Sequence, residues 1–241
     1  MFMRWMMKKV IAFLLIFIGL GVMLYPEVTD YYSAHKQEEL IDIWENQEFA
    51  PGEDIGIFEQ TNEQTAQTSY VQLDSIFPSS EGTVQAAEIE SSQEGHNEPE
   101  AEAAEREQPL SESMMGIITI DKIDVKLPIL YGASQYNLKY GAGYLSGSAL
   151  PGQNGNSAIA AHRSREYGKM FNRLDEVQEG DLITVKTREG THEYKVTSTK
   201  IVKPSDLSVL QNSSEATLTL ITCDPIDNPI NRLIVKAEKV K

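Results

Sequence analysis

Short runs rich in β-branched residues recur along the C-terminal half of the chain, with turn signals between them. The seven runs are residues 116–120, 125–130, 157–161, 182–187, 192–202, 217–223 and 233–240. Strands of this length at this spacing are typical of an all-β barrel or sandwich. A hairpin turn is expected at 188–190, and a long turn-rich loop at 147–156. Short helical turns are expected at 134–139, 169–174 and 204–210.

A different hydrophobic pattern opens the chain. Residues 10–25 contain no charged residue, and Arg4, Lys8 and Lys9 lie directly before them. This cationic flank predicts that residues 1–9 stay in the cytoplasm, that 10–25 form an uncleaved transmembrane signal-anchor, and that the rest lies outside the cell. The protein would then be a single-pass protein of the cell membrane. A cleaved signal peptide is the alternative, although no clear small-residue cleavage site follows the apolar stretch.

Residues 26–113 are strongly acidic. They hold 22 Asp and Glu against only Lys36 and Arg106, which gives a net charge of −20. Their bias towards Gln, Glu, Ser, Thr and Ala predicts a disordered, self-repelling stalk. The pattern around residues 37–47 is compatible with a short local helix. We expect the stalk to be a passive tether, because ordering a highly charged chain is costly and its contacts are screened by salt. The alternative is that part of it lies over the functional site and must be displaced.

The remaining segment, residues 114–241, is long enough for one domain. It carries 16 Lys and Arg against 14 Asp and Glu, and this balance argues against nucleic-acid binding. Cys223 is the only cysteine of the chain, so no internal disulfide can form. Outside the cell a lone cysteine is either buried as a small hydrophobic residue or kept as a reactive thiol.

Cys223 closes the run 217–223. Strand alternation places Cys223 on the face opposite Leu218 and Leu220. If the next strand returns antiparallel, Arg232 can lie opposite Cys223, with Cβ atoms about 4.5–5.5 Å apart. The spacing is therefore compatible with a thiol and a guanidinium that meet across a hairpin.

His162 is the histidine best placed to reach this cysteine. It ends the run 157–161, whereas His35 and His96 lie in the stalk and His192 lies beside a hairpin turn. A reactive thiolate needs a base that handles protons and a positive neighbour, which are roles for His162 and Arg232. The plainer alternatives are a histidine that caps a strand and an ordinary surface arginine.

Two further arginines, Arg163 and Arg165, follow His162 in the sequence. They lead into a loop, so we expect them to be solvated or structural. Arg232 is therefore the preferred candidate for the catalytic arginine, because its fixed fork of donors suits a peptide carbonyl or an oxyanion.

The pentad TLITC at residues 219–223 resembles the T-L-x-T-C signature of sortases, the transpeptidases that join surface proteins to the Gram-positive cell wall. AAHR at 160–163 is similar to the histidine segment of the family, and NRLIV at 231–235 to its arginine strand. The resemblance covers roughly residues 114–241. It implies a closed eight-stranded β-barrel, one strand more than the runs counted above.

The resemblance also implies a two-step acyl transfer. Cys223 would attack the Thr–Gly bond of an LPxTG-type sorting signal, with His162 as proton donor and Arg232 supporting the tetrahedral intermediate. An amine of the cell-wall precursor would then attack the thioester and take the acyl group. In the alternative function, the acceptor is a lysine of a pilin subunit. Thr222, next to the nucleophile, is expected to supply a supporting hydrogen bond in the site and to bind substrate. The sequence offers no metal-ligand cluster of recognisable spacing, and this mechanism needs no cofactor.

Residues 141–144, 148–152 and 231–235 look similar to class C sortases and also to class D. One N-terminal anchor followed by a C-terminal barrel is the layout of classes A and D, which favours anchoring to peptidoglycan. Class C, the pilin-polymerising class, would add a C-terminal membrane helix and an Asp-Pro-aromatic lid motif. The segment from Asp74 to Phe77, DSIF, is not a convincing substitute for that motif.

Other classes of protein remain as alternatives. A cysteine L,D-transpeptidase lacks support because its S-H-G-C-x-R signature is missing. A papain-like peptidase would place the cysteine before the histidine, at the start of a helix. The non-enzymatic alternative is a stalked surface β-domain with an inert Cys223, which should resist alkylation.

Overall fold

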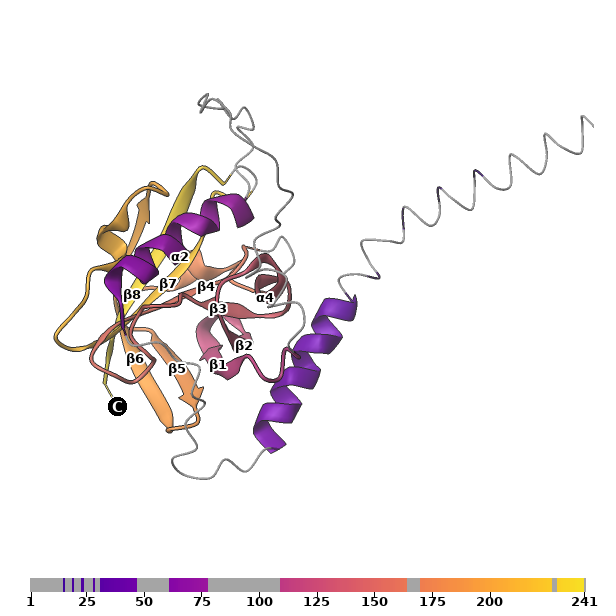
Figure 1. Ribbon diagram of the computed structural model, residues 1–241, viewed down its shortest axis with the longest axis horizontal. Helices are drawn as coiled ribbons and strands as arrows, with labels where there is room; N and C mark the ends of the chain where they lie inside the picture. The colour runs from indigo at the N-terminus through magenta and orange to yellow at the C-terminus, as the bar shows by residue number, and fades with distance from the viewer. Residues whose placement is uncertain are drawn as a thin grey trace, which may run out of the picture.

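A computed structural model describes most of the C-terminal half of the chain and two helical segments before it (Figure 1). The described residues are 31–46, 61–77, 109–163, 170–226 and 229–240, together with the single helical positions 15, 19, 23 and 28. Among these residues, no helix is both long and apolar enough to cross a membrane. The expected signal-anchor of residues 10–25 falls almost entirely outside the described residues, so it stays a prediction.

Eight strands close into a barrel. They are β1 (Met114–Ile120), β2 (Val125–Tyr131), β3 (Ala142–Tyr144), β4 (Gly155–Ala160), β5 (Leu182–Thr187), β6 (Thr191–Val202), β7 (Ala216–Asp224) and β8 (Asn231–Lys239). Around the barrel the order is β1-β2-β3-β4-β7-β8-β6-β5. β4 runs parallel to β7, whereas β8 is antiparallel to both β7 and β6. The closed eight-stranded barrel expected from the resemblance is confirmed.

β3 is the strand that the hydrophobic pattern did not predict. It has only three residues, AGY, and it pairs with β2 on one side and β4 on the other. Alanine and glycine give little strand signal by themselves, so its two neighbours define this strand. Gly143 is required by space, because a Cβ there would lie 2.6 Å from the Cα of Ala133.

Short helices complete the barrel. They are η1 (Asp121–Ile123), α4 (Gln135–Tyr140), η2 (Leu174–Glu176) and η3 (Leu207–Leu210). The last three coincide with or adjoin the helical turns expected at 134–139, 169–174 and 204–210.

Strand alternation separates two hydrophobic layers. Leu218 and Leu220 of β7 belong to the large cluster that fills the barrel interior. Ile221 and Cys223 belong instead to a second cluster on the outer wall. The predicted parity of this strand is therefore confirmed, and the cysteine lies on the outside of the barrel.

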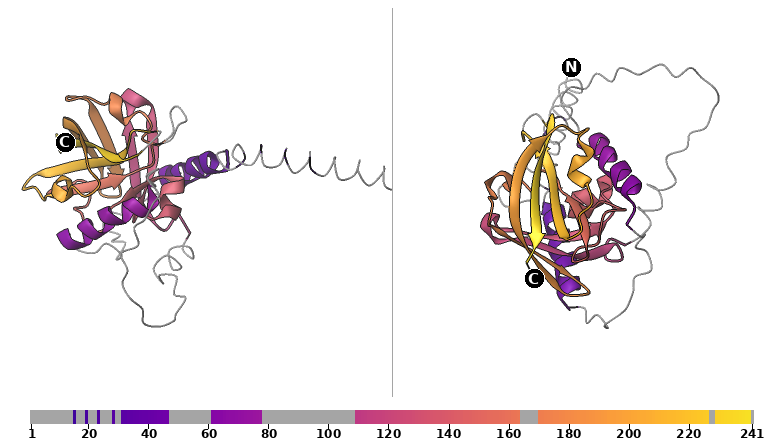
Figure 2. Two further views of the ribbon diagram at one scale, coloured as in Figure 1. Left: turned by 90° about the horizontal axis from the view of Figure 1, so that it is seen from above. Right: turned by 90° about the vertical axis from the view of Figure 1, so that its left-hand side faces the viewer.

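Helix α2 (Glu63–Ile76) covers that outer wall next to β7 and β8 (Figures 1 and 2). The side chain of Asn62 caps the helix by accepting hydrogen bonds from the backbone N–H groups of its first turn. Tyr70, Leu73 and Phe77 are fully buried in the same cluster as Cys223. Their spacing puts them on one face of the helix.

A second helical segment, residues 31–46, packs elsewhere on the barrel, near β1, β2 and α4 (Figure 1). Leu40 and Trp44 are buried against Leu130 and Tyr140. The local helix suggested by the sequence is thus present, but it is docked on the barrel and not isolated.

The expectation of disorder is wrong for residues 31–46 and 61–77. The physical reason is that a high average charge conceals apolar residues at helical spacing, which bury one face while the acidic residues stay exposed. Most of the rest of residues 26–108 lies outside the described residues, and for it the disordered stalk stays a prediction.

Candidate active site

Three neighbouring strands bring the predicted site residues to one level of the outer wall. In the antiparallel β7–β8 register, Cys223 pairs with Arg232, as the sequence predicted. The parallel β4–β7 register ends with Ala160 opposite Ile221. Two residues further along each chain, His162 is level with Cys223. The order across the wall is therefore histidine, cysteine, arginine, with the thiol in the middle.

Cys223 is buried, with 7% of its surface exposed. Burial raises the pKa of its thiol to about 11, because a thiolate is poorly stabilised away from water. Arg232 and, to a smaller extent, Arg163 oppose this shift, whereas the carboxylate of Asp74 adds to it. In this closed arrangement the cysteine is a protonated thiol at neutral pH.

His162 follows the end of β4, where its ring meets the aromatic ring of Phe77, the residue directly after α2. The ring of Phe77 packs edge-on against it, with centroids 5.1 Å apart. Burial lowers the pKa of His162, since the imidazolium form loses hydration. The histidine and the cysteine are therefore both held in their uncharged forms.

Arg232 is among the most buried large side chains of the described structure, with 2% of its surface exposed. Its guanidinium forms an ion pair with Asp74 of α2. It also lies over the ring of Phe77, with Cζ 5.3 Å from the centroid, and donates a hydrogen bond to the backbone oxygen of Asn231. A buried arginine without such partners would be very costly, so α2 compensates for its desolvation.

Residues 63–77, here called the lid, therefore close the site. Asp74 forms an ion pair with the guanidinium of Arg232, and Phe77 contacts both Arg232 and His162. The lid matches the alternative in which part of the acidic segment lies over the site, and it includes the DSIF segment. That segment lacks the proline of the class C motif, yet its acidic and aromatic residues reach the two predicted catalytic partners.

A signal for the lid was present in the sequence. Ala66, Tyr70, Leu73 and Phe77 recur at intervals of four, three and four residues, the period of an amphipathic helix. Averaging the charge over the whole acidic segment concealed this pattern.

Thr222 has a different place from the one its position beside the nucleophile suggested. Its side chain is fully buried, and its hydroxyl donates a 2.8 Å hydrogen bond to the backbone oxygen of Ala161. Strand alternation turns it away from the outer wall that carries Cys223. Thr222 joins β7 to the end of β4 through this hydrogen bond, and its expected role in binding substrate stays a prediction.

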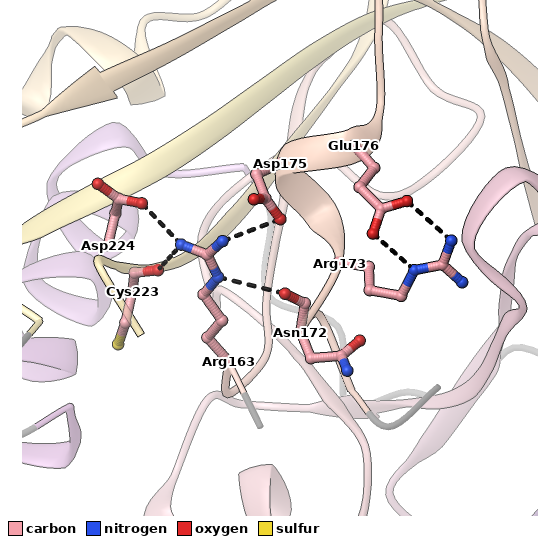
Figure 3. A network of polar contacts seen from close by, with 7 residues as sticks. All are labelled: Arg163, Asn172, Arg173, Asp175, Glu176, Cys223 and Asp224. Atoms are coloured by element: carbon pink, nitrogen blue, oxygen red, sulfur yellow. Dashed lines mark hydrogen bonds and ion pairs between the residues drawn. The ribbon is translucent and has the colours of Figure 1, made fainter. Parts of the chain in front are cut away.

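Arg163 is the other residue whose role the sequence understated. Its side chain is only 8% exposed, and it pairs with Asp175 at 2.9 Å and with Asp224 at 2.6 Å (Figure 3). The same guanidinium donates to the backbone oxygens of Asn172 and Cys223, at 3.3 Å and 3.5 Å. For Arg163 the structural alternative is confirmed and the solvated one is wrong, whereas Arg165 lies outside the described residues.

The fold and this row of residues agree with the comparisons with known proteins. The sortase domain family model matches residues 118–240, slightly more than half of the chain. The chain belongs to the sortase family. The matched segment contains His162, Cys223 and Arg232, whereas the lid lies before it.

Relatives come from several sortase classes. The chain is 32% identical over 130 residues to sortase A of Listeria monocytogenes, covering 54% of this chain and 58% of that protein. It is 33% identical over 130 residues to sortase D of Bacillus subtilis, covering 52% and 63%. The chain thus matches less than two thirds of the length of these curated relatives.

A solved structure extends the comparison to a third class. It is sortase C of Clostridium perfringens with the C-terminal cell wall sorting motif, and the match has a TM-score of 0.50 and 34% identity. It covers 53% of this chain and 71% of that one. Relatives of classes A, C and D therefore share the barrel of this chain.

Proposed function

We propose that this chain is a cysteine transpeptidase that cleaves an LPxTG-type sorting signal between Thr and Gly and transfers the acyl group to an amine. The observation that carries the proposal is the row of His162, Cys223 and Arg232 on the outer wall of the barrel. Membership of the sortase family, whose members are cysteine transpeptidases, supports the same reaction.

In the first step, the thiolate of Cys223 adds to the threonine carbonyl carbon, and the carbonyl oxygen becomes an oxyanion. The guanidinium of Arg232 is the donor suited to stabilise that oxyanion. When the C–N bond breaks, the imidazolium of His162 gives its proton to the departing glycine amine. The products are a thioester on Cys223, a neutral His162 and a free C-terminal fragment.

In the second step, an acceptor amine adds to the thioester and loses a proton to His162. The C–S bond then breaks and the thiolate is regenerated, with a new amide bond in the product. The reacting groups thus return to the thiolate and imidazolium with which the cycle began, and no electrons enter or leave.

Opening of the lid must precede this chemistry. With a thiol pKa of about 11, the protonated thiol dominates at neutral pH, and the nucleophilic thiolate is scarce. Removing Phe77 and Asp74 from the site would hydrate Cys223 and His162 and free the guanidinium of Arg232. Hydration favours the charged forms of both side chains, and the freed guanidinium stabilises the thiolate further.

The substrate side of the proposal has outside support. The related sortase C is described with the C-terminal cell wall sorting motif. We propose surface proteins bearing such a motif as substrates and an amine of the peptidoglycan precursor as acceptor. The barrel would be held outside the cell membrane by residues 10–25, with residues 1–9 in the cytoplasm.

A second candidate function is pilin polymerisation, in which the acceptor is a lysine amine of another protein subunit. The lid favours it, since an acidic and aromatic cover over the site is the class C feature expected to be absent from this chain. The two candidates differ only in the acceptor.

The test is a transpeptidation assay with the purified chain, sorting-signal peptides and two kinds of amine, a short peptidoglycan-type peptide and a lysine-containing pilin-type peptide. The products are identified by mass spectrometry. We expect an amide-linked product that Cys223→Ala abolishes. Product from the alanine variant would contradict the proposal, and the preferred amine would decide between the two functions.

A further inference from the structure

His162 follows β4 and Cys223 is the last residue but one of β7, so their relative position depends on the contacts between these two strand ends. On the side that precedes both residues, the Thr222 hydroxyl donates to the Ala161 oxygen at 2.8 Å, and the Ala161 N–H donates to the Ile221 oxygen at 3.1 Å. These two hydrogen bonds hold together the residues that directly precede His162 and Cys223.

On the side that follows both residues, the connection is made by one side chain. Arg163, directly after His162, forms an ion pair at 2.6 Å with Asp224, directly after Cys223. The same Nη1 lies 3.5 Å from the carbonyl oxygen of Cys223 itself. In Figure 3 the guanidinium lies on the carbonyl side of Cys223, with the sulfur directed away from it.

Arg163 is in turn held in place from a third direction. Its Nε donates to the backbone oxygen of Asn172 at 3.3 Å, and its Nη2 pairs with Asp175 at 2.9 Å. The same segment returns to the histidine, because the N–H of Phe171 donates to the His162 oxygen at 3.0 Å. The guanidinium therefore joins three chain segments that meet at the proposed nucleophile and base.

We propose that Arg163 is a positioning residue that fixes the distance and orientation between His162 and Cys223. This inference rests on the proposed transpeptidase function. It assigns to Arg163 no contact with substrate, which sets it apart from Arg232.

Geometry supports positioning over a purely electrostatic role. Two carboxylates, Asp175 and Asp224, neutralise the guanidinium, and its contribution to the pKa of Cys223 is smaller than that of Arg232. Proton transfer between sulfur, substrate and imidazole is sensitive to displacements of about 1 Å, which cost on the order of 100-fold in rate. A lysine could not replace Arg163, since one ammonium cannot reach Asp175, Asp224 and the two carbonyls as a planar fork does.

The chain offers a matched control. Arg173 is also largely buried, with 15% of its side chain exposed, and it forms a two-bond ion pair with Glu176 (Figure 3). It contacts neither His162 nor Cys223 in the described contacts. Arg163→Gln and Asp224→Asn can therefore be compared with Arg173→Gln and Glu176→Gln.

The experiment measures thioester formation on Cys223 in the full chain, as kcat and KM for a sorting-signal peptide, and its pH dependence. We expect Arg163→Gln to lower kcat by about 30- to 100-fold with KM within about threefold. Arg163→Lys should recover little, and Asp224→Asn should lose several-fold. Both control variants should stay within about threefold of the parent chain.

A second arm separates positioning from general stability. In a His162→Ala background, Arg163→Gln should have little further effect, because the residue that it positions is gone. Equal losses with and without His162, or control-like activity of Arg163→Gln, would overturn the inference. If Arg163→Gln does not fold, the same comparisons of kcat, with and without His162, are made for Asp224→Asn. Failure of the parent chain to form any thioester would instead refute the proposed function.

Discussion

Replacing Phe77 with alanine is expected to expose the cysteine without unfolding the barrel. Phe77 is the last residue of the lid, and its ring contacts both His162 and Arg232. Because Cys223 is the only cysteine, modification of a thiol reports on this one position. The rate of its alkylation therefore measures how often the lid opens.

The magnitude follows from the contacts that are lost. An edge-on aromatic pair is worth about 0.5–1.5 kcal/mol and a partly buried cation–π contact about 0.5–2 kcal/mol. Truncating a buried phenylalanine commonly costs about 3–5 kcal/mol in a closed core. Tyr70 and Leu73 keep part of the lid docked, so we take about 2 kcal/mol as the loss of docking free energy, which raises the open population roughly 30-fold.

The assay is alkylation of the native chain by iodoacetamide, followed by intact-protein mass spectrometry. When opening is fast compared with alkylation, the rate is proportional to the open population. The matched control is Val71→Ala on the same helix, because Val71 is 53% exposed. The reasoning is refuted if Phe77→Ala reacts within threefold of the parent while its unfolding transition confirms an intact barrel.

Three further outcomes are expected. Asp74→Asn should lower the pKa of the Cys223 thiol from about 11, since the carboxylate raises it, and the pH profile of alkylation should move to lower pH; an unchanged or higher midpoint would oppose this assignment. Arg232→Lys should retain no more than about one hundredth of the acylation rate, because an ammonium lacks the planar fork, and full activity would remove that geometric claim. Trp44→Ala should lower the free energy of unfolding by about 3 kcal/mol, measured by urea denaturation, with acylation within threefold, because Trp44 is buried in a different hydrophobic cluster from Cys223; a loss of acylation at unchanged stability would contradict this separation.

The barrel and the row of site residues were largely predictable from local patterns. Alternation along β7 correctly separated Leu218 and Leu220 from Cys223, and the connection to β8 correctly paired Cys223 with Arg232. Both predictions depend on strand periodicity, which short-range sequence determines. β3 could not be found in this way, because three residues of Ala, Gly and Tyr become a strand only between two existing neighbours.

The lid and Arg163 were harder to predict for different reasons. The apolar face of α2 is visible in the sequence, but its docking position depends on an outer wall that exists only after the barrel has closed. The partners of Arg163, Asp175 and Asp224, are distant in sequence, so no local pattern distinguishes it from a solvated arginine. The average charge of a segment predicts neither the docking of the lid nor the burial of Arg163.

The central claim is that Cys223 is the nucleophile of a site assembled from three adjacent strands. The most direct measurement is the intact mass of the Phe77→Ala chain after brief incubation with a sorting-signal peptide, with no acceptor amine added. We expect an adduct equal to the acyl fragment up to threonine, located on Cys223 and absent from the Cys223→Ala chain. An adduct on another residue, or none at all in a folded chain whose thiol reacts freely with iodoacetamide, would show that Cys223 is not the nucleophile.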